Sequence, residues 1–226
     1  MGERRPTQAF GAAVLVSGFG VSSLPEVIPV FPLENAIVLP RGQLPLNIFE
    51  PRYLAMVKTA MGGDRLIGMI QPKEDGSLFE IGGLGRITQF TDPENGRLLI
   101  VLTGVTRFRI AEELDVETPY RQVRADYRDF IEDFQAPQPM AAVLRSDLET
   151  TLRTYLDTQN LSADWEAVSG ADDESLVNTL AAVCPFDVAE KQALLEAKTV
   201  PIRAATLCAL MTLAQPGAEN GSGLVH

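Results

Sequence analysis

Hydrophobic and polar residues alternate over short intervals in the first 130 residues, and residues 44–49 (LPLNIF) show this alternation most clearly. Leu44, Leu46 and Ile48 occupy every second position there, which is the period of a β-strand. Because Pro45 has no backbone N–H to donate, this strand is expected to lie at, or begin at, an edge of the sheet.

The rest of this region carries similar strand and turn signals. Four prolines favour extended backbone around residues 28–49, and Arg41-Gly42 and Asn95-Gly96 are expected to form sharp turns. The glycines at 82–85 predict a bend or bulge where the backbone turns or lies close to a neighbour. Their spacing is not that of a phosphate-binding loop. One helix is predicted at 51–61. Besides 44–49, extended segments are predicted at 28–33, 36–39, 65–71, 78–81, 86–91, 97–103, 105–114 and 120–130.

From residue 140 onward the hydrophobic spacing changes to three and four residues, the period of an α-helix. Leu144, Leu148 and Leu152 follow this spacing. Asp187 with Glu190 three residues later is typical of a capping box at a helix start. About four helices are predicted here, the first from residue 140 and the others at 175–183, 188–197 and about 199–214.

These patterns divide the chain into four parts. Residues 1–26 are predicted to be a flexible leader, since glycines thin their apolar run and no clean signal-peptide cleavage site follows. Residues 27–134 form a β-rich lobe of about six or seven short strands, which usually close into a barrel or two packed sheets. A proline-rich boundary at 135–139 opens a helical lobe over 135–214, and 215–226 is a tail expected to be disordered.

Charge is distributed unevenly along the chain, whose net charge is −11. Residues 27–130 hold 12 Lys and Arg against 14 Asp and Glu, whereas residues 131–226 hold 5 against 14. Because nucleic-acid binding depends on clustered Lys and Arg, this balance argues against a nucleic-acid partner.

Residues suited to catalysis are scarce. His226, the last residue, is the only histidine, so neither a catalytic triad nor a histidine-containing metal site is expected. Cys184 and Cys208 lack a CxxC arrangement and are interpreted as buried thiols in a reducing cytosol. No metal and no cofactor is predicted. No run of about 18 apolar residues predicts a membrane span, and a cytoplasmic location is expected.

Two ordered motifs carry a resemblance to a known family. Residues 28–33 read IPVFPL, and residues 38–53 read VLPRGQLPLNIFEPRY. Together they resemble the signature of the Lon protease amino-terminal (substrate-binding) domain family. The glycine-punctuated segments GRITQF and GVTRFRI and the helical segment from Leu176 to Arg203 extend the resemblance over roughly residues 26–214.

This resemblance implies an α+β fold, with a PUA-like small β-barrel or pseudo-barrel followed by helices. It also implies a non-catalytic module that binds protein substrates, in protein quality control or as an adaptor. The chain lacks a GxxxxGK[ST] loop and a region for a serine–lysine protease dyad, so a stand-alone member that is not an enzyme is expected. The expected partners are unfolded or extended protein segments, with a separate protease or chaperone as a further partner.

The predicted binding surface is a groove beside the edge strand, where an extended peptide would add by strand pairing or apolar contact. The residues assigned to it are Leu44, Leu46, Asn47, Ile67 and Met69. A structural role is assigned to the signature residues Phe31, Pro32, Leu33, Pro40, Pro45, Phe49, Glu50, Arg52, Tyr53, Lys191 and Arg203. Two alternatives stay open, an RNA-binding module on the PUA-like barrel and a peptidase.

Overall fold

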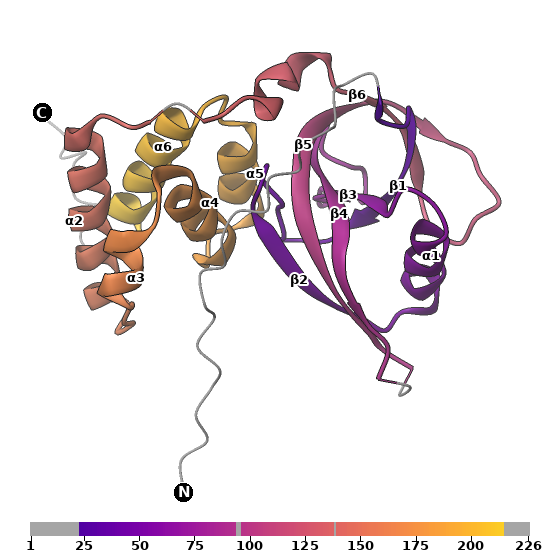
Figure 1. Ribbon diagram of the computed structural model, residues 1–226, viewed down its shortest axis with the longest axis horizontal. Coiled ribbons are helices and arrows are strands. Elements are labelled where there is room, and N and C mark those ends of the chain that lie inside the picture. Colours follow the sequence, from indigo (N-terminus) through magenta and orange to yellow (C-terminus); the bar gives the residue numbers. More distant parts are fainter. Residues whose placement is uncertain (1–22, 94–95, 138, 215–226) are drawn as a thin grey trace, which may run out of the picture.

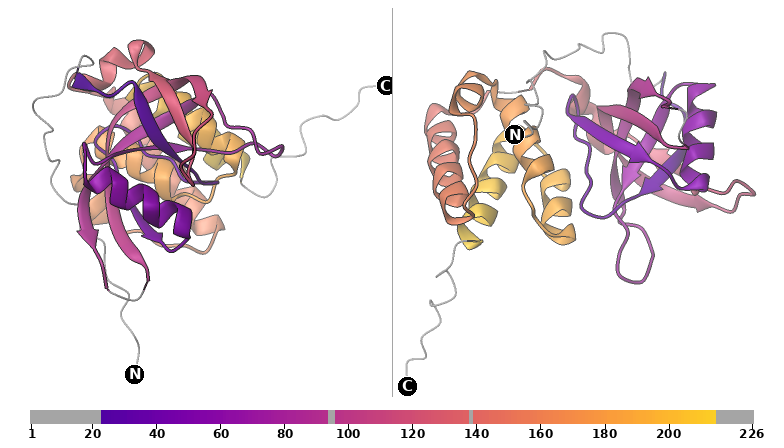
Figure 2. Two further views of the ribbon diagram at one scale, coloured as in Figure 1. Left: turned by 90° about the vertical axis from the view of Figure 1, so that its right-hand side faces the viewer. Right: turned by 90° about the horizontal axis from the view of Figure 1, so that it is seen from below.

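The computed structural model describes residues 23–93, 96–137 and 139–214, which form two lobes side by side (Figure 1). One lobe contains the strands and helix α1, and the other contains the helices from α2 onward (Figure 2). The predicted leader lies outside the described residues apart from 23–26, and the predicted tail lies outside them completely.

The β-rich lobe is built on one sheet in the order β2-β5-β4-β3-β1-β6. The sheet nearly closes on itself, because β5 is long enough to pair with β2 near its start and with β6 near its end. This mixed pseudo-barrel followed by helices confirms the predicted α+β fold. The strands are β1 (Val27–Pro32), β2 (Gln43–Ile48), β3 (Leu66–Ile70), β4 (Ile81–Thr91), β5 (Leu98–Leu114) and β6 (Gln122–Asp126).

Helix α1 (Pro51–Met61) packs on the barrel on the side away from the helical lobe (Figure 1). Proline stands at its first position, where the missing N–H would have no helical partner in any case. Tyr53, Met56, Val57 and Ala60 are buried at helical spacing, as the sequence pattern predicts, and they join the hydrophobic cluster inside the barrel.

A segment without regular structure, residues 36–40, crosses closely over β4 and β5. A Cβ atom at Gly83 would lie 1.9 Å from the carbonyl oxygen of Val38, and one at Gly104 would lie 1.9 Å from that of Leu39. Both glycines are therefore required for close backbone approach. The predicted strand at 36–39 is wrong, because these residues have no regular structure. The glycines at 82–85 lie within β4, where the register with β5 shifts between Leu84 and Gly85, as the predicted bulge requires.

The short 3-10 helix η2 (Arg128–Phe134) leads into the helical lobe. The strand predicted at 120–130 is shorter in the structure, because β6 ends at Asp126. The capping box at Asp187 and Glu190 is present with both of its hydrogen bonds. Helix α3 was not predicted from the sequence, because its six residues are too few to show a period. The helices are α2 (Ala142–Thr158), α3 (Trp165–Gly170), α4 (Asp173–Val183), α5 (Val188–Glu196) and α6 (Val200–Leu213).

A buried polar junction joins the two lobes. Arg107 of β5 pairs with Asp133 at 2.8 Å from Nη2 to Oδ1, and the two side chains are 3% and 7% exposed. The same guanidinium donates to the carbonyl oxygen of Ala197, between α5 and α6. Arg41, at the predicted corner, has a φ of 63° and donates two hydrogen bonds of 2.6 Å to Glu174 at the start of α4.

Apolar contacts cross the same junction. Ile37 and Leu39, which come before the corner, are buried in the hydrophobic cluster of the helical lobe. Residues 36–40 therefore touch the strands on one side and the helices on the other, and the two lobes share part of their core.

Candidate functional site

Strand β2 forms one edge of the sheet. It pairs with β5 along its whole length and, within the described residues, with no other strand. Gln43, Pro45 and Asn47 are exposed, whereas Leu44 and Leu46 are partly buried against the cluster inside the barrel. This is the edge position that Pro45 predicts.

One hydrogen bond fixes the direction of the backbone groups along β2. Gly104 N donates to Gly42 O at 2.8 Å, so the N–H of Gly104 points toward β2. Backbone groups alternate between the two sides of an antiparallel strand. The backbone groups of Leu102, Ile100 and Leu98 in β5 therefore also point toward β2. Their partners on β2 are Leu44, Leu46 and Ile48. The backbone groups directed to the free edge are then those of Gln43, Pro45 and Asn47.

The structure does not bring together all five residues assigned to the binding surface. Ile67 and Met69 lie on β3, where every residue is buried, and they are 0% and 1% exposed. β3 has strands on both sides and its two faces are covered, so these side chains belong to the core and are not part of the β2 edge. The accessible part of the predicted surface is thus β2 itself.

Phe49, a signature residue to which the sequence assigns a structural role, is 59% exposed. It follows buried Ile48, and because side chains alternate along a strand, the ring points outward at the end of β2. The guanidinium of Arg97 lies over this ring, 5.7 Å from its centroid. Leu99, the partner of Asn47 on β5, is 47% exposed, so apolar side chains lie beside the free edge.

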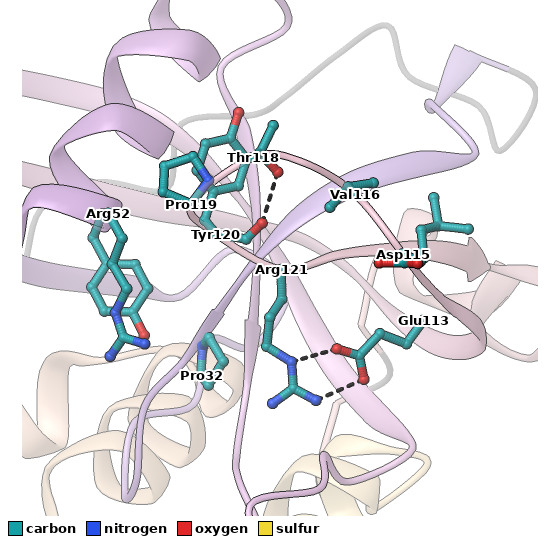
Figure 3. A pocket seen from close by; sticks show the side chains of 11 residues that line it. Pro32, Arg52, Glu113, Asp115, Val116, Thr118, Pro119, Tyr120 and Arg121 are labelled. Carbon is teal, nitrogen blue, oxygen red and sulfur yellow. Dashed lines mark hydrogen bonds and ion pairs between the residues drawn. The ribbon is translucent and has the colours of Figure 1, made fainter.

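A pocket of about 200 Å³ lies between the start of α1 and the connection from β5 to β6 (Figure 3). Three residues of the opening signature, Pro32, Arg52 and Tyr53, line one side of it. Residues 113–116 and 118–121, at the end of β5 and in the loop after it, line the other side. The sequence patterns did not assign them to a site, because a connecting loop has no period. The pocket is large enough for one side chain of a partner.

The charged groups at the rim of this pocket are held in exposed ion pairs. Arg121 donates to both carboxylate oxygens of Glu113 (Figure 3), and these hydrogen bonds lower the pKa of Glu113. Arg52 pairs with Glu50 and lies over the ring of Tyr53, 4.5 Å from its centroid. Burial raises the pKa of Tyr53. Exposed pairs of this kind contribute little to stability and can exchange partners easily.

The other signature residues occupy structural positions. Phe31 is buried with its ring 4.1 Å from that of Tyr53, Leu33 is partly buried, and the carbonyl of Pro40 accepts a hydrogen bond from Asn178. Arg203 is buried in the helical lobe and donates to the carbonyl oxygens of Leu194 and Ala197.

Lys191 is buried, and its Nζ donates to the carbonyl oxygens of Ala181 and Ala182, both at 2.7 Å, at the end of α4. These carbonyls have no partner within the helix, so the lysine acts as a cap. Burial lowers the pKa of Lys191 to about 8.

The lowered pKa of Lys191 predicts that the stability of the protein depends on pH through this residue. The folded state loses the proton near pH 8, whereas the unfolded state keeps it until about pH 10.4. The free energy of unfolding of the native protein, relative to that of Lys191→Met, should therefore rise between these values. Urea denaturation of both proteins from pH 7 to pH 10 measures the difference. A difference that stays constant or falls with pH would contradict the lowered pKa of Lys191. Titration of Cys184 does not account for the difference, because Cys184 is present in both proteins.

Within the described parts of the chain, no group of three or more His, Cys, Asp or Glu is placed to hold a metal ion. Both cysteines are free. Among the described helices, none combines the length and the apolar character that crossing a membrane requires.

Comparisons with known proteins agree with the signature. Residues 27–212 match the family described as ATP-dependent protease La (LON) substrate-binding domain. Lon protease of Cytophaga hutchinsonii is 26% identical over 196 residues, which cover 83% of this chain and 24% of that protein. Lon protease 2 of Myxococcus xanthus is 29% identical over 192 residues, covering 80% of this chain and 22% of that protein.

A solved structure shows the same fold. The crystal structure of a Lon N-terminal domain protein from Xanthomonas campestris aligns with a TM-score of 0.60 at 22% identity, over 84% of this chain and 99% of that chain. The chain spans about a quarter of the length of the curated relatives it matches. The resemblance drawn from the two signature motifs is confirmed by the family match.

Proposed function

This chain belongs to the family of ATP-dependent protease La (LON) substrate-binding domains, and we propose that it binds extended segments of other polypeptides without carrying out a reaction on them. The proposal includes a role in protein quality control or as an adaptor, in the cytoplasm. The two lobes, at residues 27–134 and 135–214, would act as one unit because they share a buried junction.

The free edge of β2 carries this proposal. Gln43 and Asn47 each offer an N–H and a C=O there, and Pro45 offers a C=O alone. An extended polypeptide can add to such an edge as a further strand, with main-chain hydrogen bonds that do not depend on its sequence. This property suits a protein that binds many different unfolded chains.

Two neighbouring features support side-chain contacts with the same polypeptide. Phe49 and Leu99 expose apolar surface beside the edge. The pocket at Arg52 and Tyr53 follows β2 within a few residues along the chain and has room for one side chain (Figure 3). Apolar contacts of this kind would add affinity to the main-chain pairing.

Substitutions at Asn47 test the proposal, because they separate the backbone N–H from the side chain. Asn47→Pro removes an N–H that points to the free edge and not to β5, so the ladder with β5 should survive. We expect it to weaken binding of a fluorescently labelled, permanently unfolded, cysteine-alkylated protein by about fivefold to tenfold, the effect of one hydrogen bond. Fluorescence anisotropy measures the affinity.

Asn47→Ala is the matched control, because it keeps the N–H and should bind within about twofold of the native protein. Equal affinities for the Pro and Ala variants, at equal melting temperatures, would remove the strand-pairing proposal. Absence of binding by the native protein would remove the polypeptide-binding proposal altogether. Binding of single-stranded RNA that weakens with added salt would instead favour the RNA-binding alternative.

A further inference from the structure

A cavity of about 110 Å³ lies at the junction of the two lobes, and both lobes supply cationic side chains to its walls. Arg41 and Arg107 come from the β-rich lobe, and Lys198 and Arg203 come from the helical lobe. The acidic residues around it are Glu132, Asp133 and Glu174. Four cations against three carboxylates give this cavity a positive charge, in a chain whose net charge is −11.

The two buried carboxylates are already used by two of the arginines. Asp133 pairs with Arg107, and Glu174 pairs with Arg41. Arg203 is left without a carboxylate within ion-pairing distance in the described residues, although its side chain is buried, at 3% exposed. Its hydrogen bonds go to neutral oxygen atoms of Leu194, Asn178 and Ala197.

A buried charge without a counter-charge is costly, because the interior replaces little of its hydration energy. Burial lowers the pKa of Arg203 to about 10, and repulsion from Arg107 and Arg41 adds to this effect, while the attraction of Asp133 and Glu174 only partly offsets it. Arg203 is therefore still a cation at neutral pH, and an anion in the cavity would relieve both effects.

Two features at the opening of the cavity favour the same kind of ligand. Lys198 is exposed there, and its ammonium makes no ion pair among the described residues. Helix α6, of 14 residues, begins at Val200 on the cavity wall, where the helix dipole favours negative charge. Its contribution is that of the dipole, because Thr199 already accepts from the N–H of Ile202 and Pro201 has no N–H.

We propose that this cavity is a binding site for a small multivalent oxyanion, of the class of inorganic phosphate or sulfate, held by Arg203, Lys198 and the start of α6. The cavity exceeds the roughly 30 Å³ that one water molecule occupies in the liquid, so an ion with several oxygen atoms has room. These three groups belong to the helical lobe, and because Arg41 and Arg107 of the β-rich lobe also line the cavity, the bound ion would lie at the junction and fasten it. This site is independent of the β2 edge.

Thermal unfolding of the full chain in inorganic phosphate tests the proposal, with chloride replacing phosphate at constant ionic strength and pH. We expect a saturable rise in melting temperature, of about 3–6 °C when phosphate reaches ten times its Kd. Lys198→Met should weaken phosphate binding by about tenfold, and Lys198→Arg should restore it. This residue is exposed, so the variants should fold.

Lys58→Met is the matched control, because Lys58 is an exposed lysine on α1 in the other lobe. It removes the same charge and should leave the phosphate response unchanged. The proposal is overturned if phosphate and chloride give the same melting temperatures at every concentration. It is also overturned if Lys198→Met responds like the native protein, or if Lys58→Met loses as much affinity as Lys198→Met.

Discussion

Asp133→Ala is expected to lower the free energy of unfolding by about 3–5 kcal/mol, because it leaves the buried guanidinium of Arg107 without a counter-charge. The carboxylate also accepts a hydrogen bond from the backbone N–H of Arg107. Arg107 in turn donates to the carbonyl oxygens of Leu195, in the last turn of α5, and of Ala197, in the connection to α6, so its disturbance should loosen the contact between the lobes. Urea denaturation followed by circular dichroism measures the change.

Glu80→Ala provides the comparison for this result. Glu80 pairs with Arg109 at 2.8 Å, but both side chains are largely exposed. An exposed pair contributes about 0–1 kcal/mol, so this variant should unfold close to the native protein. If Asp133→Ala and Glu80→Ala lower the free energy of unfolding by the same amount, the pair of Arg107 and Asp133 does not stabilise the junction as its burial implies.

Gly104→Ala is expected to be the other strongly destabilising change, by about 3 kcal/mol or more. The added methyl group would lie 1.9 Å from the carbonyl oxygen of Leu39 and 2.6 Å from its carbonyl carbon. The backbone cannot move aside easily, because Gly104 N donates to Gly42 O and Gly104 O accepts from Arg41 N. The melting temperature and the urea midpoint report the loss.

Gly170→Ala is the matched control for that substitution. Apart from its chain neighbours and the backbone of its own helix, no atom lies within 4 Å of the position that its Cβ would take, and alanine favours helix more than glycine does. We expect this variant to be as stable as the native protein or slightly more stable. A Gly104→Ala protein with native stability would show that residues 36–40 can shift away from β5.

Patterns that involve near neighbours in the sequence predicted much of this fold. Pro45 identified an edge strand, and Asp187 with Glu190 identified a helix start, because both effects depend on a few adjacent residues. Helix α3 escaped prediction because one and a half turns leave no period to detect.

The misplaced residues of the predicted site have a physical cause. Ile67 and Met69 carry the same apolar character as Leu44 and Leu46, and only the order of the strands decides which of them face solvent. Strand order depends on distant contacts, which no local pattern records. Phe49 is apolar as well, but the alternation along β2 points it outward after buried Ile48.

The corner at Arg41 has a consequence for the timing of biosynthesis. The carbonyl oxygen of Pro40 accepts a hydrogen bond from Asn178, which follows it by 138 residues, and Arg41 donates to Glu174, which follows it by 133 residues. At a synthesis rate of about 5–20 residues per second, the corner waits roughly 7–27 seconds for these partners to leave the ribosome. The corner at Arg41 therefore gains these hydrogen bonds only after α4 of the helical lobe has been made.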